Sequence, residues 1–164
     1  YGSASAIGTH GSASATGWNG SASETGERGS ASATGERGSA SAIGTYGSAI
    51  ATGTCGSASA TGTCGSASAT GERGSASATG TCGSASATGR RSVAVVTGEY
   101  SMVDAVGETA VSTATRFYWR VRKGALLLCR WRNGEYLLHS ILIADPNLDG
   151  QLVKVHEGKI VDEF

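Results

Sequence analysis

The sequence predicts an all-β protein: a β-solenoid built from nonapeptide repeats, with a small β-meander as a C-terminal cap. Three observations support this prediction. A unit of the type GSASATGER recurs from Gly2 to Arg91, small apolar and hydroxyl residues alternate within each unit, and the composition changes abruptly after Tyr118. A strict short period is typical of solenoids, whose units stack on their neighbours. We therefore expect a solenoid at residues 1–118 and a cap at residues 119–164.

The repeat itself predicts one short strand and one tight corner per unit. Positions two to six alternate, as in SASAT at residues 30–34, with alanine on one face and serine or threonine on the other, which is the period of a strand. Two glycines in every unit disfavour a helix. The glycine at position seven suits a corner with a positive φ. We expect two units, or about 18 residues, per coil. A flexible Gly/Ser linker is the alternative. The properties of a linker depend on its composition, however, and do not require the strict nine-residue period found here.

An alanine interior predicts that the solenoid gains burial elsewhere. Each buried methyl contributes about 0.8 kcal/mol, whereas ordering one backbone residue costs roughly 1–2 kcal/mol. Lateral packing of several chains or a hydrophobic cap would supply the difference. Glu24 and Val96 stand at alanine positions and do not suit a tight interior. At five places, apolar residues replace serine or stand in the less regular units at residues 92–118. We interpret these residues as a lateral interface: Ile50, Val93, Val95, Met102 and Val111.

The C-terminal residues predict two hairpins that cover the last coil. Strands are expected near residues 125–132 and 135–143, joined by Asn133-Gly134, a strong hairpin signal. A turn through residues 145–150 leads to a second hairpin, residues 151–156 and 159–163, around Glu157-Gly158. Such a cap would cover an edge that otherwise invites aggregation. Its expected core residues are Trp119, Leu127, Trp131, Leu137 and Ile141.

Charge and hydropathy exclude several classes of partner. Lys+Arg and Asp+Glu both total 13, so the net charge is zero and gives no electrostatic basis for binding nucleic acid or an anionic membrane. Neutrality also opposes self-association less than a high charge does. No apolar run approaches the roughly 18 residues that span a bilayer. The chain opens inside a repeat and without Met, so we expect a processed product or a fragment of a longer repeat array.

The cysteines leave three interpretations open. Cys55, Cys64 and Cys82 occupy corner position nine, and Cys129 lies in the expected cap. With two units per coil, Cys64 and Cys82 fall on one edge in successive coils, about 4.8 Å apart, which is within the range for a disulfide. Free exposed thiols are a second interpretation, and a metal site or chemical linkage is a third.

No other pattern indicates catalysis, a cofactor or a metal. Nonapeptide calcium repeats need a carboxylate in every turn, and the corresponding positions here are serine or alanine. No nucleophile, base and orienting group cluster in the repeats, so we expect no enzyme. The corner aromatics would suit stacking on a carbohydrate: Trp18, Tyr46, Tyr100 and Tyr118.

The run GSASATGxx, which becomes SVAVVTGEY at residues 92–100, resembles two groups of proteins. It is similar to the head repeats of YadA-like trimeric adhesins, which coil into a left-handed parallel β-roll, and to nonapeptide-repeat proteins of bacteria and their phages that end in a short β-rich cap. The adhesin repeat is longer than the unit found here. The resemblance implies trimerisation and a position on a bacterial surface or a phage fibre.

We therefore expect a non-enzymatic structural or adhesive rod that associates with itself, as a trimer or filament. It would belong to an extracellular filament, a bacterial surface or a phage fibre, with carbohydrate or a cell surface as a further partner. An ice-binding solenoid that uses the Ser-x-Ser-x-Thr face is one alternative, because such a face forms a regular grid of hydroxyl and methyl groups. A spacer that presents the C-terminal module is another.

Overall fold

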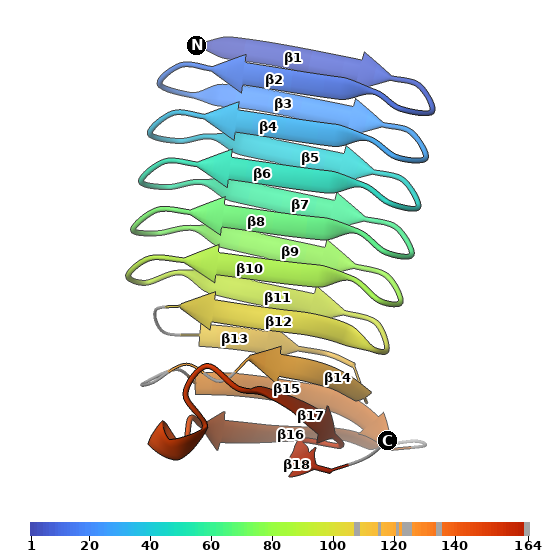
Figure 1. Ribbon diagram of the computed structural model, residues 1–164, viewed down its shortest axis with the longest axis vertical. Helices are drawn as coiled ribbons and strands as arrows, with labels where there is room; N and C mark the ends of the chain where they lie inside the picture. Colours follow the sequence, from blue (N-terminus) through green and yellow to red (C-terminus); the bar gives the residue numbers. More distant parts are fainter. Residues whose placement is uncertain (107–108, 115, 121, 123–125, 134–135, 163–164) are drawn as a thin grey trace.

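The computed structural model is a rod of two sheets whose strands alternate along the chain (Figure 1). It describes residues 1–106, 109–114, 116–120, 122, 126–133 and 136–162, and the side chains of these residues except 131–133 and 136–139. Sheet A contains β1 (Gly2–Ile7), β3 (Gly20–Thr25), β5 (Ser39–Ile43), β7 (Ser57–Thr61), β9 (Ser75–Thr79), β11 (Val93–Thr97), β13 (Thr109–Ser112), β15 (Leu126–Asn133) and β16 (Tyr136–Ile143). Sheet B contains β2 (Ser12–Thr16), β4 (Ser30–Thr34), β6 (Ser48–Thr52), β8 (Ser66–Thr70), β10 (Ser84–Thr88), β12 (Ser101–Val106), β14 (Arg116–Arg120), β17 (Leu152–His156) and β18 (Lys159–Val161).

Successive coils stack in parallel with an offset of about 18 residues. Ser3 pairs with Ser21 in sheet A, and Ser66 pairs with Ser84 in sheet B. Identical side chains therefore form columns along the rod, because each coil repeats the one before it. The predicted coil length and the all-β solenoid are confirmed, with about seven turns in the chain.

Alanine fills the space between the two sheets. In β4, Ala31 and Ala33 are fully buried, while the two serines and the threonine that alternate with them point outward. The same alternation holds in the other repeat strands. The methyl group is small, so the sheets can lie close together along the whole repeat region. The hydroxyl side chains thus form the outer surface of the rod.

The corners are held by backbone hydrogen bonds from one coil to the next. The N–H of Gly62 donates to the carbonyl of Thr79 at 2.9 Å, and the N–H of Cys64 donates to the carbonyl of Thr45 at 2.8 Å. Gly62 has φ +154°, and a Cβ at this position would collide with the carbonyl oxygen of Gly44. Glycine is therefore required both by the backbone conformation and by the close approach of the neighbouring coil.

The coil shortens at the C-terminal end. Ser75 pairs with Val93 in the regular repeats, but Val93 pairs with Thr109, which is closer in the sequence. The last, less regular unit of the repeat region therefore departs from the nine-residue period. Tyr118, expected at a corner, lies instead within β14 opposite Met102. The expected boundary between residues 118 and 119 falls inside the same strand.

The two predicted hairpins are present, but each extends a different sheet. β15 pairs with β13 in parallel and with β16 in antiparallel fashion, so the first hairpin continues sheet A. β17 pairs with β14 and β18, so the second hairpin continues sheet B. Between the hairpins lies the 3₁₀ turn η1 (Pro146–Leu148), which is capped by the Asp145 side chain. The expected meander is thus divided between both sheets. In sheet A the hairpin contains the last parallel strand, β15, and covers it with β16, whereas in sheet B the hairpin covers the last parallel strand, β14, with β17.

The interior widens from alanine to large side chains toward the cap. Val96 and Val103 are fully buried, and the last coils enclose Phe117, Trp119, Leu127 and Val155, all fully buried as well. Trp119 and Leu127 therefore lie in the core as expected. This plug supplies apolar burial that the alanine coils lack.

One of the expected core residues lies elsewhere. Ile141 is 64% exposed, so its assignment to the cap core is wrong. It alternates along β16 with Ser140 and Leu142, which are partly buried, and strand alternation places it on the outer face. The side chains of Trp131 and Leu137 lie outside the described residues.

Glu24 lies inside the solenoid, where alanine would be expected. Its side chain is fully buried, and neither carboxylate oxygen has a hydrogen-bond partner among the described residues. The carboxylate occupies the space beside Gly29 and Gly11, where a Cβ would meet it. Alanine stands at the same place in the coils on either side, at Ala6 and Ala42. A buried carboxylate without hydrogen bonds is costly, so this coil is destabilised relative to its neighbours.

We predict that Glu24→Ala stabilises the N-terminal coils by at least about 2 kcal/mol, because it removes this uncompensated group. Hydrogen exchange of the β1, β3 and β5 amides, with a denaturant titration, measures the change. Glu27→Ala, at an exposed corner of the same unit, serves as the control and should change stability by less than about 0.5 kcal/mol. Equal effects of the two substitutions would contradict this account of Glu24.

Candidate functional site: the outer faces of the solenoid

The outer faces present hydroxyl groups in columns along the rod. On sheet B, an unbroken and exposed column is formed by Thr16, Thr34, Thr52, Thr70 and Thr88. On sheet A, isoleucine replaces threonine at Ile7 and Ile43, both of which are exposed. The more regular hydroxyl grid therefore belongs to sheet B.

The five residues of the predicted lateral interface all lie on outer faces, but on two different sheets. Val93, Val95 and Val111 are on sheet A, in the neighbouring strands β11 and β13. Ile50 and Met102 are on sheet B, where β8 and β10 separate their strands. The five residues therefore do not form one patch. The apolar character is concentrated on sheet A, where it continues into the cap.

We define the sheet A apolar face by six residues on the last four strands of the sheet. Val95 pairs with Val111, Val111 with Leu128, and Leu128 with Ile141. A second column ends in Leu126 paired with Ile143. The four cap residues are all exposed, and Ile143 reaches 76%. The complete set is Val95, Val111, Leu126, Leu128, Ile141 and Ile143.

Sequence reasoning found the valines of this face and missed the four cap residues. Both β15 and β16 are apolar at consecutive positions, as in LLLC and ILIA, so alternation alone does not say which side chains point outward. The outward side chains of β15 can be assigned only when its pairing with β13 is known, in which Leu126 lies opposite Thr109.

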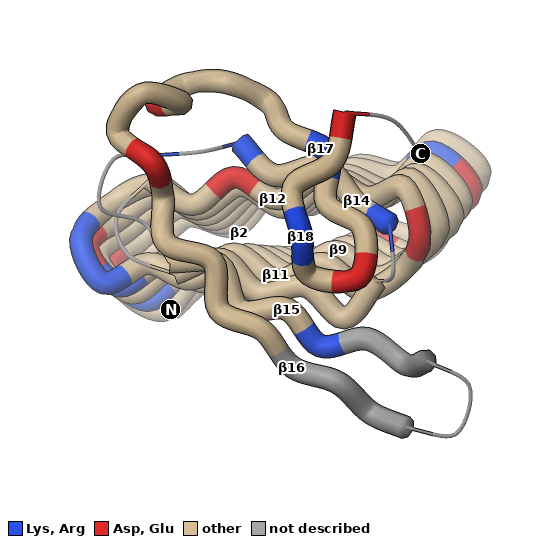
Figure 2. Tube along the Cα trace, turned by 90° about the horizontal axis from the view of Figure 1, so that it is seen from below, with Lys and Arg blue, Asp and Glu red and all other residues tan. Residues whose placement is uncertain are grey.

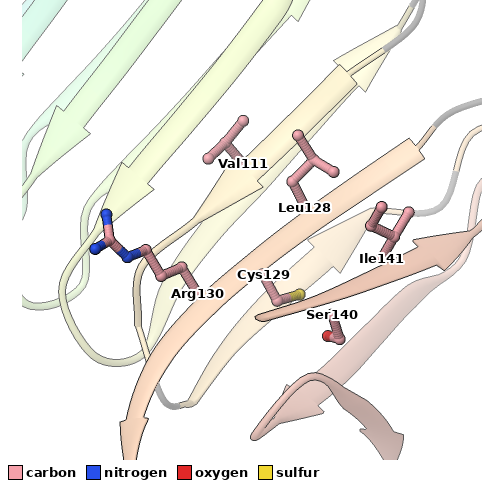
Figure 3. Close-up of a pocket in the computed structure, with 6 residues that line it drawn as sticks. All are labelled: Val111, Leu128, Cys129, Arg130, Ser140 and Ile141. Carbon is pink, nitrogen blue, oxygen red and sulfur yellow. The ribbon is translucent and has the colours of Figure 1, made fainter. Parts of the chain in front are cut away.

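A hollow of about 240 Å³ adjoins this face, lined by Val111, Leu128, Cys129, Arg130, Ser140 and Ile141 (Figure 3). Its lining is mainly apolar, with Arg130 at one side. Burial raises the pKa of the Cys129 thiol to about 11, an effect that its hydrogen bond with Ser140 partly offsets. Cys129 is therefore a protonated, inward-facing thiol at neutral pH and contributes apolar surface to the cap interior.

The exposed charged residues of the repeat region gather at the corners, and the faces between them are largely free of charge (Figure 2). One exception on sheet B is Asp104, whose carboxylate accepts two hydrogen bonds from the Arg122 guanidinium, at 2.8 and 2.9 Å. Its Oδ2 atom also lies 3.8 Å from Nε of Arg120. The hydrogen bonds to Asp104 are the main reason why the pKa of Arg122 is raised. This pairing ties the chain after β14 to the outer face of β12.

The corner cysteines lie where the repeat frame predicts. Cys64 and Cys82 follow β7 and β9, neighbouring strands of sheet A, and Cys55 follows β6 on the opposite edge. The cysteines are free in this structure. The two neighbouring corners differ in conformation: Cys82 has φ +54° and donates its N–H to Glu99, whereas Cys64 donates to Thr45 on the other side. A disulfide between Cys64 and Cys82 stays a prediction.

The corner aromatics do not form one platform. Trp18 lies on one edge, whereas Tyr46 and Tyr100 follow β5 and β11 on the other edge, with β7 and β9 between them. The guanidinium carbon of Arg28 lies 5.4 Å from the Tyr46 ring centre, and that of Arg116 lies 5.8 Å from the Tyr100 ring centre. These cation–π contacts strengthen the edges.

Within the described part of the chain, no three His, Cys, Asp or Glu side chains come together as a metal site would require. No helix among the same residues has the length and hydropathy needed to cross a membrane.

We predict that Cys129 reacts last with an alkylating reagent at pH 8. The thiolate is the reacting species, and a pKa raised from 9.0 to about 11 lowers its fraction about 100-fold. Cys82 is exposed, and Cys55 and Cys64 are partly exposed. Mass spectrometry of the iodoacetamide-treated native protein should show three fast additions and one slow one, and Cys129→Ser should remove the slow one. Equally fast labelling of Cys129 and Cys82 in the folded protein would contradict the buried position of Cys129.

Searches for related proteins give no match: no family model, no curated protein and no solved structure is similar to this chain.

Proposed function

We propose that this protein is a non-enzymatic structural or adhesive rod, an element of an extracellular filament, a bacterial surface or a phage fibre, and that it associates with copies of itself. The observation that carries the proposal is the sheet A apolar face, which lies exposed on a neutral rod. Contiguous exposed apolar surface of this kind marks interaction sites in soluble proteins.

Three further features support the proposal. The repeat columns give an evenly spaced scaffold, because each coil pairs with the next in identical register. The alanine interior buries little apolar area per residue, so contacts between rods would add to a small net free energy of folding. A net charge of zero leaves no long-range repulsion between copies.

Light scattering on a sizing column, followed by negative-stain electron microscopy, tests the proposal. We expect the full chain to elute with the mass of two or more 16.3 kDa copies, or to form filaments, at micromolar concentration. The images should show rods of uniform width. A strictly monomeric protein at all concentrations up to about 100 μM would overturn the self-association on which the proposal rests.

A second candidate function is ice binding, and the unbroken threonine column of sheet B favours it. Exposed threonines at ~4.8 Å intervals supply the hydroxyl and methyl groups of a regular grid. The candidate predicts thermal hysteresis that is lost in Thr52→Tyr and Thr70→Tyr. The same substitutions on sheet A, Thr61→Tyr and Thr79→Tyr, are the controls, because isoleucine interrupts the column there. Absence of thermal hysteresis in the unmodified protein would exclude this candidate.

A further inference from the structure

The corners that carry Cys64 and Cys82 lie next to each other on one edge of the rod. They follow β7 and β9, which are neighbouring strands of sheet A (Figure 1). Before the corner, β7 and β9 pair in identical register. After the corner, the N–H of Ser84 donates to the carbonyl of Gly65 at 2.8 Å. Because the two coils are bonded on both sides of the corner, the Cα atoms of the cysteines lie about one strand spacing, about 4.8 Å, apart.

The backbone between these two corners lacks a hydrogen bond that regular corners make. In a regular corner, the residue at position nine donates its N–H to position eight of the preceding coil, as Cys64 does to Thr45 at 2.8 Å. Cys82 donates instead to Glu99 in the following coil, at 3.1 Å. The carbonyl of Thr63, which is the regular acceptor for Cys82, therefore receives no hydrogen bond from the described residues.

The conformation of the chain changes at the same place. Cys82 has φ +54°, and it is the first position-nine residue along the chain in the left-handed region, followed by Arg91 and Tyr100. This region is unfavourable for a residue that carries a side chain. We call residues 62–64 and 80–82 the open corner, because two corner conformations meet there without the usual bond between them.

The two thiols of the open corner can be reached from solvent. Cys82 is exposed and Cys64 is partly exposed. Cys55 is also partly exposed, but it follows β6 on the opposite edge, so a whole strand separates it from the pair. A disulfide needs Cα atoms about 4.4–6.8 Å apart, and one strand spacing meets this condition. The open corner therefore brings together two accessible thiols at a suitable distance.

We propose that Cys64 and Cys82 form an oxidation site, and that their disulfide takes the place of the missing corner bond and locks two neighbouring coils together. The oxidant is a low-molecular-weight disulfide such as oxidised glutathione. The site is closed in an oxidising environment and open in one that keeps thiols reduced. This inference does not depend on the self-association proposed above.

The oxidation takes two thiol–disulfide exchanges. Cys82, the more exposed residue, loses its proton, and its thiolate attacks one sulfur of the oxidant. The S–S bond of the oxidant breaks and releases one glutathione thiolate, which takes up a proton. Cys64 then loses its proton and attacks the Cys82 sulfur of the mixed disulfide, which releases the second glutathione thiolate to be protonated. The two protein thiols lose two electrons in total, and one oxidised glutathione becomes two reduced glutathiones.

Oxidised glutathione added to the dilute, fully reduced chain tests the proposal. We expect peptide mapping by mass spectrometry without reduction to find Cys64 linked to Cys82 within one chain. Cys55 should be free or carry a single glutathione. A link from Cys55 to either residue, or glutathione on both Cys64 and Cys82 without a link between them, would overturn the proposal.

Single substitutions separate the two exchange steps. Cys64→Ser removes the second thiol, so the reaction should stop with glutathione on Cys82. Cys55→Ser is the matched control, and it should form the link at the rate of the unmodified chain. Equal amounts of glutathione on Cys82 in Cys64→Ser and in the unmodified chain would show that Cys64 does not displace it.

Hydrogen exchange tests whether the disulfide locks the coils. The Gly62 and Ser84 amides bond across the open corner, and oxidation should slow their exchange at least about tenfold, because the link opposes local opening. The Cys55 amide, which donates to Glu36 on the opposite edge, is the control and should change less than about twofold. Equal exchange in the oxidised and reduced chains would overturn the locking role.

A closed corner provides a matched comparison for the missing bond. Tyr46→Cys combined with Cys82→Ser moves the pair of thiols by one coil, to corners that are joined by the Cys64–Thr45 hydrogen bond. Because this bond restricts the backbone adjustment that disulfide geometry needs, the link should form at least about tenfold more slowly. An equal rate would show that spacing alone determines the reaction and would overturn the role given to the open corner.

Discussion

The backbone ladder between successive coils is the constraint on which the rest of the structure depends. Each repeat strand is bonded to the strand about 18 residues away, and the corner N–H groups continue the ladder around the turns. The ladder works only if neighbouring corners approach closely, which excludes a side chain at Gly62 because of the Gly44 carbonyl. The close spacing also determines which residue types occur at the other positions of the repeat. Alanine is the residue whose methyl fills the narrow interior, and hydroxyl or charged residues face water.

The same constraint explains why the apolar surface lies where it does. Alanine coils have little room for large residues inside. Apart from Glu24, the large buried side chains of the described residues lie toward the C-terminal end, where Val96 and Val103 precede the plug of Phe117 and Trp119. In this transition the outer positions also become apolar, first in β11 and then through the cap hairpin. The end of the rod therefore combines its largest buried side chains with its most apolar surface. A single region thus serves as cap and as the contact surface that we propose.

Much of the fold could be predicted from the sequence because the period is strict. The coil of two units and both hairpins follow from phase and turn residues. Alternation separates an alanine face from a hydroxyl face, but Glu24 and Val96 at alanine positions left open which face is the interior. The shortening of the coil near Thr109 could not be predicted, because the last units are too irregular to count. The outward position of Ile141 was missed for a different reason: an apolar run on both sides of a strand hides its alternation.

The most direct test of the ladder account compares Gly62→Ala with Gly8→Ala. The two glycines have nearly equal φ, +154° and +157°, but a Cβ at Gly8 meets no atom within 4 Å, whereas one at Gly62 collides with Gly44. Hydrogen exchange of the two proteins measures the protection of amides in the neighbouring coils. The account predicts that Gly62→Ala removes protection from the coils on both sides and that Gly8→Ala changes protection only at its own corner. Similar losses in the two variants would show that backbone conformation, and not the spacing between coils, determines the role of glycine.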